Sequence, residues 1–329
     1  MIASFSVRDP RGSVENPAVS VVIPCYKVTE FISAALDSVL NQTFRNFEII
    51  LVNDGCPDTR NLERALAPYS DKIVYIVQEN QGPAAARNSA ILASRAPLIA
   101  MLDGDDFWEP NYLQVQVEYL EANPEVDVAY PEAWLFGDTA AGRLHSEFVP
   151  SDAPNFINVA ARRCHIFYGV TARKAAVMSA GFYDPALRSG EDLDLWLRML
   201  HAGCKFASHG IPLVHYRQRS GSLTDNRFTL GDLTLGAYQK LLSSSDLSAD
   251  ERKALKEGVD RTIASVDLVA GKKALYGGDF DEALKRFSRA NSVLNTTKLR
   301  VAIALLRVCP QLLHAYLHRR YPTEHIYLH

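Results

Sequence analysis

The sequence predicts an α/β fold, in which a mostly parallel sheet is covered by helices on both faces and is followed by a helical region. The first reason is that short apolar runs alternate with helix-spaced apolar residues from Ala18 to about Asp225, as in repeated strand–helix units. The second is that several of these runs end abruptly in polar residues, as strands do at a ligand-binding sheet edge. The third is that only helical spacing continues from Phe228 to about Arg320.

The individual strands are expected where apolar runs are bounded by turn residues. They are Ala18–Ile23 (stopped by Pro24), Phe47–Val52, Ile73–Val77, Pro97–Leu102, Val126–Tyr130, a short strand around His165–Val170, and Ile211–Tyr216. Helices are expected where apolar residues recur at helical spacing. They are Phe31–Leu40 (which Thr29 can cap), Asn61–Ala67, Ala84–Ser94, Pro110–Ala122, Arg173–Ala180 and Leu193–His201. The Gly-, Pro-, Asp- and Ser-rich stretch Phe136–Asn155 predicts a loop.

Three segments are expected along the chain. Residues 1–17 are polar and charged, which predicts a loose leader and not a signal peptide. Residues 18–225 form the α/β domain and residues 226–329 a helical region. In that region Ala274–Phe287 resembles one helical hairpin of a tetratricopeptide repeat. Leu299–Tyr316 predicts a buried core helix, with a basic amphipathic helix on a membrane as the alternative; it is too short and charged to span one.

Composition excludes several classes of function. Of the 329 residues, 47% are hydrophobic and 22% charged, as in an ordinary globular protein. The net charge of −3 gives no electrostatic support for a nucleic-acid partner. The five cysteines are scattered and form no Cys-x-x-Cys pair, so neither a zinc site nor a disulfide framework is indicated. We therefore expect reduced thiols in a cytoplasmic protein, with peripheral contact at the inner face of the membrane as an alternative.

The densest chemical signal is a cluster of carboxylates after the fourth strand. Asp103, Asp105 and Asp106 follow the apolar run that ends at Leu102. At the carboxyl end of a parallel strand they would lie where open α/β sheets bind ligands. Clustered carboxylates repel one another unless a positive charge lies among them, and a divalent cation bridging substrate phosphates would supply it. Taken alone, the cluster also fits a solvated turn before a helix.

Other strands end in polar residues that would converge on the same edge. The first ends at Pro24 and Tyr26, and the second in Asn-Asp54-Gly. Asp54 can accept a ring N–H from a nucleotide base, although the same tripeptide is also a common turn. Arg87 lies in the second turn of a helix whose N-terminus would face this edge. Helix N-termini attract anions and Arg suits phosphate; the alternative is a surface Arg.

A second constellation stands around the start of the Leu193–His201 helix. Glu191 and Asp192 precede it, either as helix-capping acids or as a carboxylate base pointing into the cleft. Trp196 can pack against a sugar or lie in the core. Arg217 and Arg219 form a basic loop that could bind a diphosphate. The chain contains neither Gly-x-Gly-x-x-Gly after the first strand nor a Walker sequence, which argues against a dinucleotide enzyme and an NTPase.

Taken together, these stretches resemble the family-2 inverting glycosyltransferases, which have the Rossmann-like GT-A fold of nucleotide-diphospho-sugar transferases. Six stretches match in the family's order over roughly Ala18–Thr224. They are Val19-Ser-Val-Val-Ile-Pro-Cys-Tyr26, Leu36-Asp-Ser-Val-Leu-Asn-Gln-Thr43, Ile50-Leu-Val-Asn-Asp-Gly55, Asn80-Gln-Gly-Pro-Ala-Ala-Ala-Arg-Asn88, Leu102-Asp-Gly-Asp-Asp106 and Gly190-Glu-Asp192.

The resemblance implies roles for the matching residues. Asp54, Arg87 and Asp103, with Pro24 and Tyr26, would bind the nucleotide. Asp103 and Asp105 are the Asp-x-Asp pair, with Asp105 the direct ligand of Mg²⁺ or Mn²⁺. Asp192 would be the catalytic base with Glu191 beside it. Family members often have a histidine where this chain has Arg219, while His215 precedes the loop, so no third, His-type ligand is assigned.

The implied function is transfer of a sugar, with inversion, from a nucleoside-diphosphate sugar to a hydroxyl. UDP is the expected nucleotide, and the acceptor is a carbohydrate, a lipid-linked molecule or another hydroxyl compound, in polysaccharide or glycoconjugate synthesis. A sugar-1-phosphate nucleotidyltransferase is the alternative enzyme, although the Gly-rich, Arg-containing loop typical of that class is missing after the first strand. A binding or scaffold protein with a degenerate transferase domain is the non-enzymatic alternative, against which the complete acidic set argues.

Overall fold

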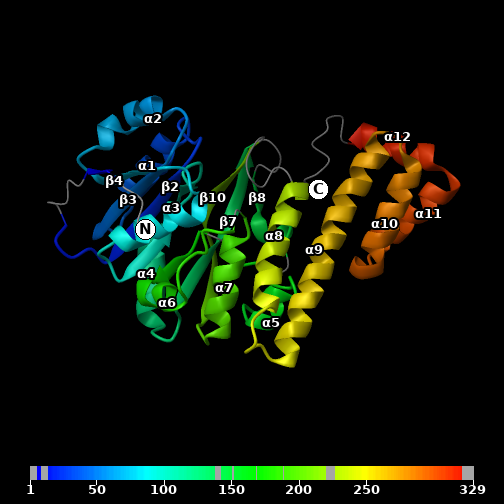
Figure 1. Cartoon of the computed structure of the whole chain (residues 1–329). Coiled ribbons are helices and arrows are strands. Elements are labelled where there is room, and N and C mark those ends of the chain that lie inside the picture. The colour runs from blue at the N-terminus through cyan, green and yellow to red at the C-terminus, as the bar shows by residue number, and fades with distance from the viewer. Residues whose placement is uncertain are drawn as a thin grey trace. The chain divides into compact units, whose positions relative to one another are not determined.

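The computed structural model describes residues 6–8, 14–137, 142–149, 152–167, 169–187, 189–219 and 227–320. The chain divides into two compact units (Figure 1). The first comprises Met1–Val159 with Arg163–Gln218, and the second Ala160–Arg162 with Arg219–His329. The domain boundary predicted at residues 225 and 226 lies outside the described residues.

The first unit is built on one large mixed sheet. Its strands are β1 (Ser6–Arg8), β2 (Val19–Cys25), β3 (Phe47–Asp54), β4 (Ile73–Gln78), β5 (Leu98–Met101), β6 (Phe107–Trp108), β7 (Val128–Gly137), β8 (Arg143–Leu144), β9 (Thr171–Arg173) and β10 (Phe206–Gln218). The order across the sheet is β1-β4-β3-β2-β5-β9-β7-β10-β6, with β8 on β7. The strands β4, β3, β2, β5, β7 and β10 run in one direction, because β9 lies antiparallel between β5 and β7. The mostly parallel sheet is therefore confirmed.

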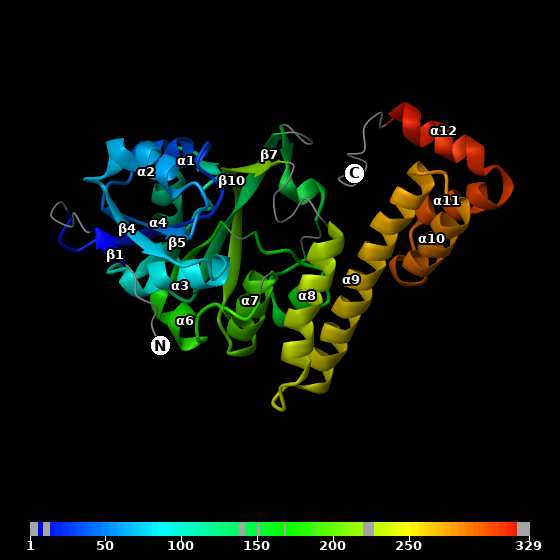
Figure 2. The same cartoon turned by 45° about the horizontal axis from the view of Figure 1, so that its top comes forward.

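Helices cover both faces of this sheet (Figure 2). They are α1 (Ile32–Leu40), α2 (Thr59–Leu66), α3 (Pro83–Ala93), α4 (Tyr112–Ala122), α6 (Lys174–Ser179) and α7 (Glu191–His201). The short helix α5 (Phe156–Ala160) runs across the division between the units at Val159. On one face Leu36 of α1, Leu62 of α2 and Leu113 of α4 join a single apolar core with the sheet residues Val21 and Leu51. Figure 2 shows α3, α6 and α7 on the other face. Strands β2 and β3 are buried almost throughout, which explains their continuous apolar runs.

Several local expectations need correction. Ser6–Arg8, in the supposed loose leader, pairs antiparallel with β4. Strand β2 continues through Pro24, and the residue before α1 is Phe31, so Thr29 does not cap that helix. The strand expected at His165–Val170 is instead β9, a few residues later. Residues 136–155 are not only loop, because β7 extends to Gly137 and β8 follows.

The second unit is helical over the residues that the structure describes. Its helices are α8 (Arg227–Leu242), α9 (Ala249–Tyr276), α10 (Phe280–Leu294), α11 (Thr297–Val308) and α12 (Pro310–Arg320). Helices α9 and α10 pack as a hairpin joined by Gly277–Asp279, where Gly278 has φ of +80°, so the hairpin expected at Ala274–Phe287 is present. Buried Leu275, Phe287 and Leu306 belong to a separate core between α9, α10 and α11.

The single buried helix expected at Leu299–Tyr316 is wrong. Two helices meet there at Cys309 and Pro310, because proline cannot continue the first helix. Leu306 is buried, but Val308 is 84% exposed and Leu312 60% exposed. In the described part of the chain, no helix is long and apolar enough to cross a membrane.

Close packing of α9 against α10 gives a stability prediction. A Cβ added at Gly271 would lie 2.5 Å from Cδ1 of Phe287, whose ring is buried. Overpacking costs about 1–3 kcal/mol, more than the ~1 kcal/mol that Ala gains over Gly in a helix. We expect Gly271→Ala to lower the melting temperature in a thermal unfolding experiment.

Gly277→Ala is the matched control at the end of the same helix. Its φ is −75° and an added Cβ would have 3.5 Å of clearance, so it should be neutral or stabilise by about 0.4–1 kcal/mol. A Gly271→Ala protein as stable as the Gly277→Ala protein would contradict the packing argument.

Candidate active site

The predicted site residues lie at the carboxyl ends of adjacent parallel strands. Asp54 ends β3, Cys25 ends β2, and Asp103 follows β5 after one residue. The loop after β5 packs tightly against the loop after β2: a Cβ at Gly104 would lie 2.8 Å from Val28 Cγ2 and 3.3 Å from the Pro24 carbonyl oxygen. Glycine is therefore needed between Asp103 and Asp105.

Arg87 connects three carboxylates from two other segments. Its side chain is only 6% exposed. The guanidinium donates from Nη2 to Asp103 Oδ1 at 2.9 Å and from Nη1 to Glu191 Oε1 at 2.8 Å. Asp192 Oδ1 is 3.8 Å from the same Nη1. Arg87 is therefore buried among these carboxylates. The alternative that it is a surface arginine is excluded.

The carboxyl group of Asp192 has a pKa well above that of an ordinary aspartate. Burial raises its pKa to about 7; the neighbouring Arg87 opposes this shift, while the carboxylates of Glu191 and Asp103 add to it. Its Oδ1 is enclosed and accepts no hydrogen bond from the residues that the structure describes, although 28% of the side chain is exposed. Such a carboxylate can exchange a proton near neutral pH with a molecule on its open side.

The start of α7 fixes these two acids. Gly190 precedes the helix with φ of +75°, a left-handed conformation that glycine adopts readily. The chain therefore turns sharply into α7 with Glu191 and Asp192 in the first turn, where the helix dipole favours negative charge. Tyr183, which is 1% exposed, lies beside them, and its ring centroid is 5.5 Å from the Arg87 guanidinium.

Asp194 has a different, structural role. It is fully buried and pairs with Arg198 one turn later, at 2.7 Å from Nη2. Arg198 in turn donates to the carbonyl oxygens of Ala180 and Phe182. The pair therefore ties α7 to the turn after α6.

Asp54 is buried and already holds the loop that leads into α3. Its carboxylate accepts hydrogen bonds from Gln78 Nε2 at 2.7 Å, from the Gln81 backbone N–H at 3.0 Å and from the Gly82 backbone N–H at 2.8 Å. These bonds place the N-terminus of α3, and hence Arg87, against the strand ends. Any contact of Asp54 with a nucleotide base would use its remaining acceptor capacity.

Arg217 is hydrogen-bonded to the loop after β5, which contains Asp105 and Asp106. Its Nε donates to the Asp105 carbonyl oxygen at 2.8 Å and its backbone N–H to Asp106 Oδ1 at 2.7 Å. The guanidinium lies 4.4 Å from the ring centroids of both Phe31 and Phe136. β10 thereby brings a cation to the loop after β5, next to the Asp105 backbone.

The other predicted residues vary in exposure. Tyr26 is 41% exposed and Pro24 partly buried at the same edge. Trp196 is 2% exposed and packs edge-on against Tyr183 and Phe206, so it takes the core position of the two that the sequence allows. Arg219 is partly buried at the end of the described segment.

His215, which precedes Arg217 on β10, contacts Glu109 and Phe107. Its Nε2 lies 2.7 Å from Glu109 Oε1, and its ring stacks on Phe107. Among the described residues, no group of three or more His, Cys, Asp or Glu side chains could hold a metal by itself. Asp103 and Asp105 nevertheless offer hard oxygen donors at a partly exposed position, which fits a cation completed by substrate phosphates.

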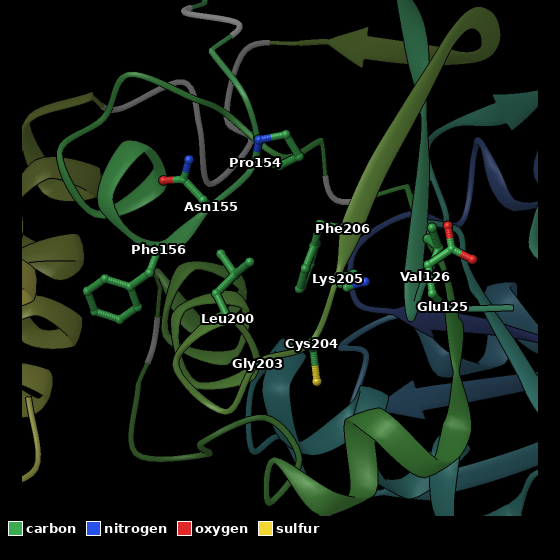
Figure 3. A pocket seen from close by; sticks show the side chains of 10 residues that line it. All are labelled: Glu125, Val126, Pro154, Asn155, Phe156, Leu200, Gly203, Cys204, Lys205 and Phe206. Atoms are coloured by element: carbon green, nitrogen blue, oxygen red, sulfur yellow. The ribbon is translucent and has the colours of Figure 1, made fainter. Parts of the chain in front are cut away.

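A separate hollow of about 380 Å³ lies away from these residues (Figure 3). Glu125 precedes β7 and Lys205 precedes β10, so it opens at the amino ends of these parallel strands. Arg217 and the acidic loop are at the opposite, carboxyl end of β10. The hollow is therefore not part of the candidate site.

Sequence comparison identifies the family. The model of glycosyl transferase family 2 matches residues 20–176. An uncharacterized glycosyltransferase of Rickettsia prowazekii, RP339, is 26% identical over 242 residues, which are 70% of this chain and 74% of the relative. The putative teichuronic acid biosynthesis glycosyltransferase TuaG of Bacillus subtilis is 26% identical over 235 residues, or 69% and 89% of the two chains.

Residues 20–176 form a glycosyl transferase family 2 domain.

Solved structures support the same fold for this family-2 glycosyltransferase. TarS 1-349 of S. aureus, in complex with UDP-GlcNAc, superposes with a TM-score of 0.61 at 16% identity, covering 92% of this chain and 91% of TarS 1-349. The mannosyltransferase PcManGT of Pyrobaculum calidifontis, in complex with GDP-Man and Mn²⁺, gives a TM-score of 0.57 at 14% identity, with 96% and 90% covered. The GT-A fold is thus confirmed.

Tyr183 is the site residue that the sequence did not reveal. It lies between Gly181 and Gly190, in a stretch that has neither a periodic apolar pattern nor a recognisable motif. The structure places its ring 5.5 Å from the Arg87 guanidinium and its hydroxyl near the Asp192 carboxylate, where it lowers the pKa of Asp192 against the larger effect of burial. Its ring closes one side of the Arg87 site that holds Glu191 and Asp192.

The raised pKa of Asp192 predicts a pH-dependent stability. Because the folded state binds this proton more tightly than the unfolded state, whose pKa is 3.8, the contribution is full below pH 3.8 and is lost as pH rises toward 7. We expect Asp192→Asn to flatten the fall in unfolding free energy between about pH 4 and pH 7, measured by urea denaturation with a chelator present.

Asp194→Asn is the contrasting variant. It leaves Arg198 without its carboxylate and should cost roughly 2–3 kcal/mol at neutral pH, below the ~3–5 kcal/mol of a fully buried pair, since Arg198 is 22% exposed. If Asp192→Asn left the pH slope unchanged, the raised pKa would be wrong.

Proposed function

We propose that this family-2 glycosyltransferase is a metal-dependent, inverting enzyme that moves a sugar from a nucleoside-diphosphate sugar to an acceptor hydroxyl. The observation that carries the proposal is the Arg87 site, where Asp103, Glu191 and Asp192 meet around one buried guanidinium. UDP is the proposed nucleotide, supported by the complex of TarS 1-349 with UDP-GlcNAc, while PcManGT binds GDP-Man. The acceptor, carbohydrate or lipid-linked, belongs to polysaccharide or glycoconjugate synthesis.

The donor is proposed to lie across the carboxyl ends of β2, β3 and β5. Pro24, Tyr26 and Asp54 would meet the nucleoside, and Arg87 and Asp103 would hold the ribose and diphosphate side. Asp103 and Asp105 would hold Mg²⁺ or Mn²⁺, which when bound stabilises the negative charge of the leaving diphosphate. Arg217 and Arg219 are the cations proposed to lie nearest that diphosphate.

Asp192 is the proposed general base. Its carboxylate accepts the proton of the acceptor hydroxyl, and the acceptor oxygen forms a bond to the anomeric carbon. The bond from that carbon to the donor phosphate oxygen breaks, and its electron pair leaves with the nucleoside diphosphate. Attack from the side opposite the leaving group inverts the configuration. A pKa of about 7 suits a group that takes up this proton near neutral pH.

Glu191 and Tyr183 are proposed to position the base. Glu191 occupies Arg87 Nη1 at 2.8 Å while Asp192 remains 3.8 Å away. The guanidinium charge is thereby shared with Glu191 and does not lock Asp192 in a close pair. This arrangement supports Asp192, and not Glu191, as the carboxylate that keeps its basicity.

Substitution at the acids tests the assignment. Asp192→Asn keeps the size of the side chain but removes its basicity, so turnover should fall by about 10²–10⁴-fold. Nucleotide affinity should change little, since Asp192 acts on the acceptor. The measurement is release of free nucleoside diphosphate from a panel of nucleotide sugars, alongside UDP binding by calorimetry.

Glu191→Gln and Asp194→Asn are the matched comparisons. Asp194→Asn should lose stability before it loses chemistry, because its carboxylate pairs with Arg198 within α7. Normal turnover in Asp192→Asn together with a dead neighbouring variant would overturn the base assignment and leave the family assignment intact.

Metal binding is tested without activity. A ligand that binds only the folded state stabilises it, by about 2.7 kcal/mol at one hundred times its Kd. UDP with Mn²⁺ should therefore raise the melting temperature of the native protein more than UDP alone. Asp105→Asn should remove this Mn²⁺-dependent increment.

Asp71→Asn, at an exposed carboxylate before β4, is the control and should keep the increment. Equal shifts with UDP in the presence of Mn²⁺ and of a chelator would refute the proposed metal dependence.

A further inference from the structure

The second unit contains a long stretch without acidic residues. From Ala283 to Arg320 the sequence has no Asp or Glu, but eight Lys and Arg residues, in a chain of net charge −3. Two of these cations near the start, Arg286 and Arg289, are paired with Asp267 of α9. The cations of α11 are not neutralised in this way.

Lys298, Arg300 and Arg307 of α11 are exposed. No carboxylate lies within ion-pair distance of any of them among the residues that the structure describes. Arg300 donates to the Asn295 side-chain oxygen, an uncharged group. Unpaired cations on one helix produce a local positive potential.

The same helix exposes apolar residues that a packed helix would bury. Leu299 and Leu306 form its inner side and are 6% and 5% exposed. Val301, Ala304 and Val308 recur at a spacing of three and four residues, which places them on one outer stripe. Val301 is 53% and Val308 84% exposed. α11 is therefore apolar on its outer face as well as its inner one.

Cations flank this outer stripe on both sides. At about 100° per residue, Lys298 lies on one side of Val301 and Val308, and Arg300 and Arg307 lie on the other. Exposed Leu312 and Tyr316, four residues apart, continue the apolar character on one side of α12. An apolar stripe with flanking Lys and Arg is the pattern of a helix that lies in a membrane interface, and the flanking stems can extend toward headgroups.

A hollow beside the stripe is suited to a phosphate. It lies between α10 and α11, measures about 380 Å³, and has Arg300 and Arg307 on one side with Ser288, Asn291 and Ser292 on the other. Arginines with neutral hydrogen-bonding side chains are a common combination for phosphate groups. The hollow thus adds a headgroup-sized polar recess to the cationic stripe.

We propose that α11, together with the exposed side of α12, is a docking surface for an anionic lipid membrane. Charge complementarity selects this occupant. A second copy of the chain would bring unpaired cations against like cations, which is unfavourable. A nucleic acid would match the cations but would leave Val301 and Val308 without an apolar partner, whereas acyl chains at an interface cover them. The proposal does not depend on the catalytic assignments.

The test uses full-length protein and sedimentation with vesicles. Wild-type protein should bind vesicles of phosphatidylglycerol and phosphatidylcholine in about equal amounts and not vesicles of phosphatidylcholine alone. The variant Lys298→Gln/Arg300→Gln/Arg307→Gln should reduce the partition coefficient on the order of 10²-fold, since each interfacial cation contributes about a factor of five to ten. Val301→Ser/Val308→Ser should also weaken binding, and more visibly at high salt, where only the apolar contact remains.

The control Arg60→Gln/Arg64→Gln/Lys72→Gln removes the same charge from exposed positions of the first unit and should bind as wild type does. Melting temperatures of all variants should match that of the wild type, because every changed side chain is exposed. Failure of the wild type to bind anionic vesicles, or equal loss in the control, would overturn the proposal. So would a wild-type dimer that Val301→Ser/Val308→Ser converts to a monomer with vesicle binding unchanged, which would make the stripe an interface between copies.

Discussion

The candidate site depends on one buried guanidinium. Arg87 joins the loop after β5 to the first turn of α7, through Asp103 at 2.9 Å and Glu191 at 2.8 Å. These segments are far apart in the sequence. A buried cation is stable only when it is paired, and its desolvated carboxylates are stable only beside it. The position of each group therefore fixes the position of the others.

This arrangement leaves more negative than positive charge. Asp103, Glu191 and Asp192 surround a single Arg87, so one carboxylate must take up a proton or a further cation must bind nearby. The raised pKa of Asp192 is the first response, and a cation at Asp103 and Asp105 would be the second. Under the proposed function, acid–base chemistry and metal binding at this edge would be linked through the same charge excess. A proton on Asp192 should reduce the need for a cation at Asp103 and Asp105, and a cation there should reduce the need for the proton.

The central parallel strands could be predicted because buried strands leave a strong signal. β2, β3 and β5 are almost continuous apolar runs, whereas β1, β6 and β8 are only two or three residues long and were not predicted. β9 was misplaced since Ile166, Phe167 and Val170 are apolar and buried without being paired as a strand. Apolar periodicity in the sequence indicates which residues are buried. It does not indicate which of them pair as a strand, because pairing depends on partners distant in the sequence.

The candidate site was predicted in a different way. Asp54, Arg87, Asp103, Asp105 and Asp192 were proposed through their motifs, whereas neither spacing nor propensity indicated what each side chain touches. Asp194 carries the same charge as Asp192 and lies two residues away on α7, but it points to Arg198 because residues two apart on a helix face different directions. Tyr183 had no signal, since its role depends only on the proximity of Arg87.

The C-terminal helices show the limit of the same periodicity argument. In α11, Leu299 and Leu306 repeat at one helical phase and Val301 and Val308 at the opposite phase, and both pairs are equally apolar in the sequence. Only the contacts of α9 and α10 decide that the leucines are covered and the valines are not. A helix that is apolar on both sides is expected either to be buried throughout or to contact an apolar partner on its exposed side. In α11 the exposed side is the one flanked by unpaired cations, in a chain of negative net charge. The charge pattern therefore argues for an apolar partner that also carries negative charge.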